Sequence, residues 1–200
     1  MLMLALLVFP ATATHAEKAD RKEKVTINAI DGDADHGKGF YRLEKAVVIA
    51  QGTLRITADR GTAQTGRNES YRTTLTGKPV CFRERTDNGD WAQGVADRVD
   101  YDSASGVVEL FGNAILFVGD DETRANYIMY NTQSSKYKAR DSKQRGSDGK
   151  GVTFVLQPRE KAETPVKDAG ADATKAANKP PVVKTNTPPK RNEPAFSRCT

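Results

Sequence analysis

The sequence predicts an all-β fold followed by a disordered C-terminal tail. From residue 25 to residue 156, no run of apolar residues at the helical spacing i, i+3, i+4 and i+7 continues beyond two turns, whereas apolar and polar residues alternate repeatedly. Turn-forming pairs such as Asp31-Gly32 and Ser105-Gly106 interrupt this alternation at intervals of about 8–12 residues. Short strands at this spacing are typical of an antiparallel sandwich, roll or barrel.

The first 16 residues predict a secretory signal peptide. They contain no Asp, Glu, Lys or Arg, and residues 2–9 form an apolar run of eight. That run is shorter than the ~20 residues needed to cross a bilayer, and it matches the apolar region of a signal sequence. Small residues ending at Ala16 fit a cleavage site, and a charged segment, residues 17–24, follows. We therefore expect an exported protein, with an apolar N-terminal strand as the alternative.

The predicted β-domain covers residues 25–158. Its candidate strands share short alternating patterns and comprise residues 25–27, 41–43, 53–57, 80–83, 98–101, 108–110 and 152–154. Between the first two, residues 31–35 resemble the start of a calcium loop. An EF-hand, however, needs Gly at position six and Glu at position twelve, where this chain has His36 and Arg42. We expect a polar turn or linker here and no metal site.

A weak internal repeat runs through the β-domain. Its three copies are Thr57-Ala58-Asp59, Val95-Ala96-Asp97 and Arg124-Ala125-Asn126, separated by 38 and 29 residues. Repeated hairpins that cannot bury a face alone must stack on their neighbours, as in β-rolls and solenoids. An open roll leaves its first and last strands unpaired, and an unpaired strand edge is a template for another chain.

The basic charge of the chain belongs mainly to its C-terminal part. The whole chain has a formal charge of +5, but residues 157–200 hold nine Lys or Arg against five Asp or Glu and seven of the nine prolines. The β-domain is therefore nearly neutral, which argues against a nucleic-acid partner. Residues 159–200 contain too little apolar surface to fold, so we expect a disordered, basic, proline-rich tail.

The chain contains two cysteines. Cys81 lies in a candidate strand and Cys199 lies in the tail. Export permits a disulfide, but a flexible tail would not hold a cysteine in the geometry that the bond requires. We expect the fold not to depend on a bond between these two residues.

Catalytic patterns are missing from the sequence. Outside the predicted signal peptide the only histidine is His36, and no Gly-x-Ser-x-Gly, phosphate-binding loop, Cys-x-x-Cys or His-Glu-x-x-His motif is present. Asp97, Asp100 and Asp102 suggest a carboxylate pair, but Arg98 is expected on the same face, as on a solvated exterior. We expect no enzyme activity and no cofactor.

The apolar alternation leaves two interpretations open. The inward side chains could form a packed core, which is the more common fate of apolar and aromatic residues on strands. If the roll stays open, the same side chains would line a groove for acyl chains, favoured by about 0.8 kcal/mol per buried methylene.

Four motifs resemble the OstA-like family of periplasmic lipopolysaccharide transport proteins. They are QGTLRITAD at residues 51–59, GKPVCF at 77–82, LFGNA at 110–114 and VTFVLQP at 152–158. Their order and spacing agree across about residues 25–158, which is the whole predicted domain.

The resemblance implies an open antiparallel β-jellyroll whose apolar interior holds the acyl chains of lipopolysaccharide. In this family, copies joined end to end form a bridge across the periplasm from an LptC-like inner-membrane protein to an LptD-like outer-membrane translocon. We therefore expect a periplasmic lipopolysaccharide carrier that associates with itself and with these partners. Strands at residues 25–29 and 152–156 are the expected pairing edges.

The resemblance also suggests residues that line the groove. Positions carried over singly are Val25, Ile27, Phe82 and Tyr101. Strand parity adds further candidates, namely Leu43, Leu54, Ile56, Val99, Val108, Leu110, Ile128, Tyr130, Val152, Phe154 and Leu156. A β-bulge would shift this parity by one residue in any strand that contains it.

Two rival functions remain open. One is an LptC-like, membrane-anchored protein of the same fold, which would retain an apolar N-terminal segment of about 20 residues. The other is a periplasmic β-sandwich that binds polysaccharide through exposed aromatic side chains.

Overall fold

The computed structural model describes residues 20, 22–66, 68, 70–141, 151–157, 196 and 199. The predicted signal peptide at residues 1–16 lies outside these residues, as does the tail apart from Phe196 and Cys199. All ten regular elements of the described part are strands, which agrees with the predicted all-β fold. In this part of the chain there is no helix of the length and apolarity that a membrane span requires.

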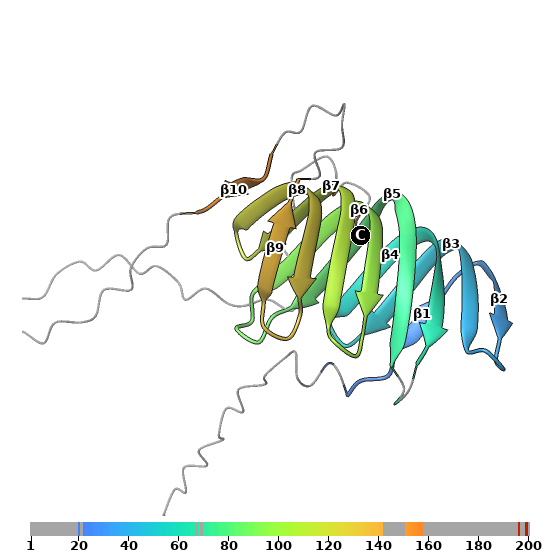
Figure 1. Ribbon diagram of the computed structural model, residues 1–200. Coiled ribbons are helices and arrows are strands. Elements are labelled where there is room, and N and C mark those ends of the chain that lie inside the picture. Colours follow the sequence, from blue (N-terminus) through green and yellow to red (C-terminus); the bar gives the residue numbers. More distant parts are fainter. Residues whose placement is uncertain are drawn as a thin grey trace, which may run out of the picture.

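The strands form one antiparallel sheet (Figure 1). Its main path runs in the order β1-β3-β4-β5-β6-β7-β8-β10, while β2 also pairs with β3 and β9 also pairs with β8. The ends of the path are therefore β1 and β10, as expected. A second short edge strand lies at each end, because β3 pairs with both β1 and β2, and β8 pairs with both β9 and β10. The bounds are β1 Thr26–Asn28, β2 Asp31–Asp35, β3 Phe40–Gln51, β4 Leu54–Thr65, β5 Tyr71–Arg85, β6 Trp91–Asp102, β7 Val107–Val118, β8 Asp121–Asn131, β9 Lys136–Arg140 and β10 Thr153–Val155.

The long strands are interrupted by β-bulges at neighbouring positions. The register shifts between Glu44 and Val47 on β3, between Thr76 and Val80 on β5, and between Phe111 and Ala114 on β7. Bulges bend a strand and increase its twist, so a row of them across adjacent strands folds a sheet over. The result in Figure 1 is a roll in which each long strand contributes to two facing layers.

One side-chain contact shows that the two layers meet. The ring centroids of Phe82 on β5 and Tyr130 on β8 are 5.9 Å apart. These strands are three positions apart in the sheet, a separation of roughly 14 Å if the sheet were flat. The contact therefore crosses the interior of the roll, from one layer to the other.

The internal repeat marks the row of bulges. Ala58 and Ala96 turn into the core, where their exposed fractions are 8% and 1%. The following aspartates face the bulge of a neighbouring strand: Asp59 accepts a hydrogen bond from the Lys78 amide at 3.1 Å, and Asp97 accepts one from the Asn113 side chain at 2.9 Å. The repeat therefore encodes a bend with a small interior residue and a polar brace.

Residues 31–35 form a strand, not the expected turn or linker. β2 pairs with residues 40–44 of β3, and the turn of this hairpin lies at residues 36–39. The sequence did not reveal the strand because all five side chains are exposed and no apolar alternation is needed there. Backbone pairing alone forms this edge.

The tail was expected not to hold Cys199 in the geometry that a disulfide requires, and the structure corrects this. Cys81 and Cys199 form a disulfide, and Phe196 is 6% exposed with its ring centroid 5.6 Å from that of Phe117. Cys81 and Phe117 belong to an outer apolar patch with Val95 and Ile115, on the face opposite the main core. This patch gives the single aromatic residue of the tail a place to dock, and that docking holds Cys199 beside Cys81.

Candidate functional site

The predicted lining residues are mostly brought together in one buried core. Ten of them have exposed fractions of at most 7%, namely Leu43, Leu54, Ile56, Phe82, Val99, Tyr101, Val108, Leu110, Ile128 and Tyr130. Val25 and Ile27 are partly buried and pack against this cluster. Phe154 is 54% exposed on β10, and its ring lies 6.4 Å from that of Tyr137, which packs on the cluster. Of the two other parity candidates, Val152 is partly buried and Leu156 is 68% exposed.

Strand register explains why these side chains share one face. Ile49, Ile56 and Phe82 lie directly opposite one another across β3, β4 and β5. In the other layer Val99, Leu110 and Ile128 form the same kind of row across β6, β7 and β8. Because alternate residues of a strand point to the same face, each row extends along its strands at every second position.

Sequence reasoning missed several members of the interior. These residues lie beside bulges or between the four motifs that resemble the transport family. They are Val47, Ile49, Tyr71, Leu75, Val80, Ala92, Ala96, Ala114 and Leu116. Leu75 and Val80 show the difficulty, because both are fully buried although one is odd-numbered and the other even-numbered. The signal that could have found them is Gly77-Lys78-Pro79, a turn-like sequence inside a strand that indicates a bulge.

Side chains from the two layers pack against one another inside the roll. Gly94 shows how closely the layers approach, since a Cβ atom added there would lie 2.8 Å from Leu110 Cδ2. The interior is mainly apolar, but it also holds the buried polar side chains of Thr73, Glu84 and Thr123. The Thr123 hydroxyl donates a hydrogen bond to the Tyr137 hydroxyl at 3.2 Å. Where the layers touch in this way, an apolar ligand would have to separate them or displace these side chains.

The layers meet along a seam on the side opposite the bulges. Gln51 pairs with Leu54 at one end of β4, and Tyr71 pairs with Thr65 at the other end. An extended strand of this length spans roughly 36 Å, yet the Tyr71 hydroxyl donates a hydrogen bond to Gln51 Oε1 at 3.2 Å. This bond therefore closes the roll, and burial raises the pKa of Tyr71 to about 12.

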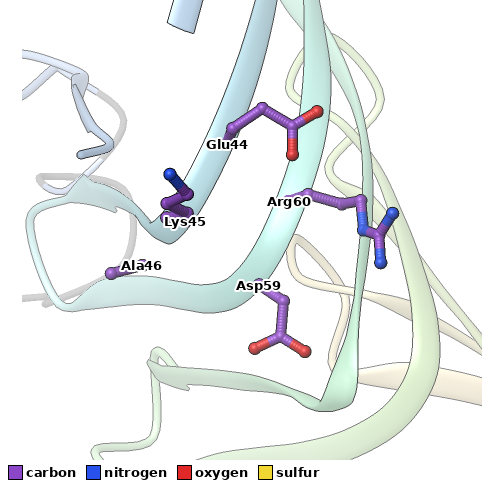
Figure 2. A pocket seen from close by; sticks show the side chains of 5 residues that line it. All are labelled: Glu44, Lys45, Ala46, Asp59 and Arg60. Carbon is purple, nitrogen blue, oxygen red and sulfur yellow. The ribbon is translucent and has the colours of Figure 1, made fainter. Parts of the chain in front are cut away.

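A surface pocket lies at the bulge of β3. It has a volume of about 500 Å³ and is lined by the five side chains drawn in Figure 2, which are Glu44, Lys45, Ala46, Asp59 and Arg60. Two of these side chains are acidic, two are basic, and only the alanine is apolar. Such a lining does not suit an acyl chain, so the buried interior remains the candidate lipid site.

Asp100 and Asp102 of β6 lie in ion pairs on the exterior, as expected. Arg98 contacts Asp100 at 3.0 Å and Arg72 contacts Asp102 at 2.7 Å. The hydrogen bond from Arg72 lowers the pKa of Asp102, whereas a general acid needs a raised one. Across the part of the chain that the structure describes, no group of three or more His, Cys, Asp or Glu side chains could hold a metal ion.

Two other side chains with shifted pKa values, Arg83 and Tyr127, lie on the outer face. Arg83 lies directly opposite Arg55 on β4, and burial, with the Arg55 charge, lowers the pKa of Arg83. Tyr127 donates a hydrogen bond to Glu109 at 2.5 Å. Burial and this carboxylate raise the pKa of Tyr127 to about 12. Neither group faces the interior, so neither contributes to the candidate lipid site.

Comparison with known proteins gives concordant matches. Residues 26–136 match the family described as LptA/(LptD N-terminal domain) LPS transport protein. The lipopolysaccharide export system protein LptA of Haemophilus influenzae is 29% identical over 163 residues, covering 79% of this chain and 91% of that protein. LptA of Escherichia coli K12 is 26% identical over 178 residues, covering 85% and 94%.

A solved structure shares the fold. It is LptH, the LptA-homologous periplasmic component of the lipopolysaccharide transport device of Pseudomonas aeruginosa, which matches with a TM-score of 0.64 at 22% identity. The match covers 70% of this chain and 99% of that chain. The described roll is therefore the β-jellyroll seen in that protein.

Proposed function

The chain belongs to the LptA/(LptD N-terminal domain) LPS transport protein family, and we propose that it is a periplasmic carrier that holds lipopolysaccharide by its acyl chains during export to the outer membrane. The observation that carries this proposal is the continuous apolar interior between two layers. Each methylene transferred from water into such an interior is favoured by about 0.8 kcal/mol. An anionic amphiphile would thus be held by its tails, while its charged headgroup stays in solvent.

Loading requires the layers to part, and the seam is the place where this is easiest. The bulge side is continuous backbone, whereas the opposite side is closed by contacts such as the hydrogen bond between Tyr71 and Gln51. A neutral hydrogen bond contributes only about 1 kcal/mol net. We infer that acyl chains enter along the seam and displace interior contacts such as that between Phe82 and Tyr130.

The carrier works without chemistry of its own. His36 is exposed in the turn after β2, and Asp100 and Asp102 of β6 are ion-paired on the outer face. Neither arrangement supports acid–base or nucleophilic catalysis. We infer a passive conduit, with directional movement driven by other components.

Assembly end to end would extend the conduit into a bridge. Exposed apolar side chains lie at both ends of the sheet, with Ile30 between β1 and β2, and Phe154, Val155 and Leu156 at β10. Strand addition at these edges would cover them and continue the backbone pairing. By the same mechanism the terminal copies would pair with an LptC-like inner-membrane protein and an LptD-like outer-membrane translocon.

Site-specific photo-crosslinking tests lipid capture. A photoreactive residue at Phe82 or Tyr101, both buried in the core, should capture lipopolysaccharide, while the same residue at Arg98 on the outer face serves as the control. Capture at Phe82 that is no stronger than at Arg98 would contradict the proposal. Binding of lipid-free polysaccharide alone would instead favour a sugar-binding sandwich.

A further inference from the structure

The two ends of the sheet carry opposite charges in a matching pattern. β2 presents Asp31, Asp33 and Asp35 at alternate positions, all exposed. β9 presents Lys136, Lys138 and Arg140 at alternate positions, also exposed. Alternate side chains share one face of a strand, so each end bears a row of three like charges. Of these, Asp35 also pairs with Lys38 of its own chain at 3.2 Å.

Both rows lie on the outer face of the roll. On β2 the intervening Gly32 lies opposite the core residue Leu43, so the aspartates point outward. On β9 the intervening Tyr137 and Ala139 pack against the core, so the basic side chains point outward as well. The charged faces would therefore coincide if the strands of two copies were paired.

We propose that the acidic row of β2 and the basic row of β9 pair between successive copies of this chain and so fix the head-to-tail order and the register of the assembly. This inference rests on the end-to-end association in the proposed function and adds to it the residues that select the partner edge. In an antiparallel pair centred on Asp33 and Lys138, Asp31 lies opposite Arg140 and Asp35 lies opposite Lys136. On the inner face the same register places Gly32 opposite Ala139, where a small side chain fits.

Strand direction permits this arrangement. β2 runs antiparallel to β3 and β9 runs antiparallel to β8, while the long strands between them alternate. Consequently β9 of one copy and β2 of the next run in opposite directions when both copies have the same orientation. The alternation of the sheet then continues across the junction.

The second pair of edge strands comes into register at the same time. On β3, the partners of Asp33 and Ile27 are Arg42 and Ile49, seven positions apart with one extra bulge residue between them. On β8, the partners of Lys138 and Phe154 are Met129 and Thr123, six positions apart with no extra residue. Without its bulge residue, the spacing from Arg42 to Ile49 on β3 is also six positions and equals the spacing from Thr123 to Met129 on β8. Pairing Asp33 with Lys138 therefore also sets Ile27 opposite Phe154.

The charges also oppose incorrect pairing. Two copies could pair their β9 strands about a two-fold axis, but Lys136 would then face Arg140, and like charges directly opposite are unfavourable. Two β2 strands would place aspartates opposite aspartates in the same way. Only the mixed pair brings opposite charges together, which specifies a chain of copies rather than a closed dimer.

A charge-swap experiment tests the proposal with the purified protein. One variant carries Asp31→Lys and Asp33→Lys, and the other carries Lys136→Glu and Lys138→Glu. Sedimentation velocity at low and high salt measures self-association. We expect each variant alone to associate more weakly than the wild type by on the order of tenfold, and the wild type to weaken as salt is raised.

Mixing the two variants gives the decisive result. In an equimolar mixture each β2 finds a β9 of opposite charge, so association should return to the wild-type level, as it should when all four substitutions are combined in one chain. The control Lys45→Glu with Arg60→Glu makes the same change in net charge as Lys136→Glu with Lys138→Glu but alters neither charged row; it lies at two residues of the Figure 2 pocket and should leave association unchanged. Variants that associate like the wild type, or a mixture that does not recover, would overturn the charge-pairing proposal.

Lipopolysaccharide capture at Phe82, measured on the same variants, separates this proposal from the proposed function. Normal capture with unchanged association in all variants refutes the charge pairing and leaves the carrier intact. A wild type that stays monomeric refutes end-to-end assembly together with the charge pairing. Loss of capture with normal charge-dependent association refutes the lipid site alone.

Discussion

Asp97 on β6 accepts a hydrogen bond from the side-chain amide of Asn113 on β7, with 2.9 Å between Oδ2 and Nδ2. Both residues lie where the register of these strands shifts, and the preceding Gly112 has a φ of 75°. A Cβ atom at Gly112 would come within 2.5 Å of Asp97 Oδ2. The carboxylate therefore joins two adjacent bulges at the bend of the roll.

Substitution Asp97→Ala should destabilise the bend. It leaves the Asn113 amide without this acceptor, and we expect the free energy of unfolding to fall by about 1–2 kcal/mol. Urea denaturation monitored by circular dichroism measures the change. Asp33→Ala, on an exposed edge strand, serves as the control and should change stability by less than about 0.5 kcal/mol. Equal effects of the two substitutions would show that Asp97 does not brace the bend.

Reduction of the disulfide should release the C-terminal clip, formed by Phe196 and Cys199. A disulfide typically contributes about 2–4 kcal/mol, and the bond also keeps Phe196 on the outer apolar patch. We expect a reducing agent to lower the melting temperature of the wild type and to increase binding of a dye specific for exposed apolar surface. Cys199→Ser should already show the lower melting temperature and should not respond to reductant. A wild type insensitive to reductant would contradict this prediction.

The raised pKa of Tyr71 predicts a loss of stability in alkali. In the unfolded chain a tyrosine loses its proton near pH 10, whereas in the folded protein the pKa of Tyr71 is raised to about 12. Its contribution is therefore fully present below about pH 10 and is lost as the pH rises toward 12. From about pH 9 to about pH 11, the unfolding free energy should decline by about 1 kcal/mol less in Tyr71→Phe than in the wild type.

The same variant tests the seam. Tyr71→Phe lacks the hydroxyl that bonds to Gln51, so the layers should separate more readily. Lipopolysaccharide crosslinking at Phe82 should become faster, while crosslinking at the outer Arg98 stays at background. Tyr127→Phe is the matched control, because its hydroxyl bonds to Glu109 outside the interior. An equal effect of both variants would place the entry route elsewhere.

Proline at position 154 should weaken assembly through the backbone. Phe154→Pro removes an amide donor from β10, which either detaches this strand from β8 or removes a donor from the free edge. Both effects reduce pairing with a second copy, measured as intermolecular crosslinking. Phe154→Ala keeps the amide and should retain more crosslinking. Normal crosslinking of the proline variant would show that β10 is not a pairing edge.

The sequence was most informative where alternation is uninterrupted. The family resemblance supplied Tyr101 on β6, strand parity added Val99 on β6 together with Val108 and Leu110 on β7, and the structure buries all four. Parity stops working at a bulge, because an extra residue changes which side of the strand the following residues occupy. For this reason Leu75 and Val80 were missed.

Two other features depend on information that local patterns do not contain. All five side chains of β2 are exposed, so its sequence shows no alternation of buried apolar and exposed polar residues. Only its backbone pairing with β3 identifies it as a strand. The docking of Phe196 depends on outward apolar residues such as Val95 and Ile115, on strands about 80–100 residues away in the sequence. Neither the sequence around Phe196 nor that of the strands carrying Val95 and Ile115 contains a local pattern that predicts this contact.

The bond between Cys81 and Cys199 also changes the connectivity of the molecule, because it closes a covalent ring with a sequence separation of 118 residues. A protease that cuts once between these cysteines opens the ring without releasing a fragment. The cut protein keeps its mass on a non-reducing gel and separates into two pieces only after reduction. Degradation of the oxidised protein therefore needs two cuts, or one cut and a reductant.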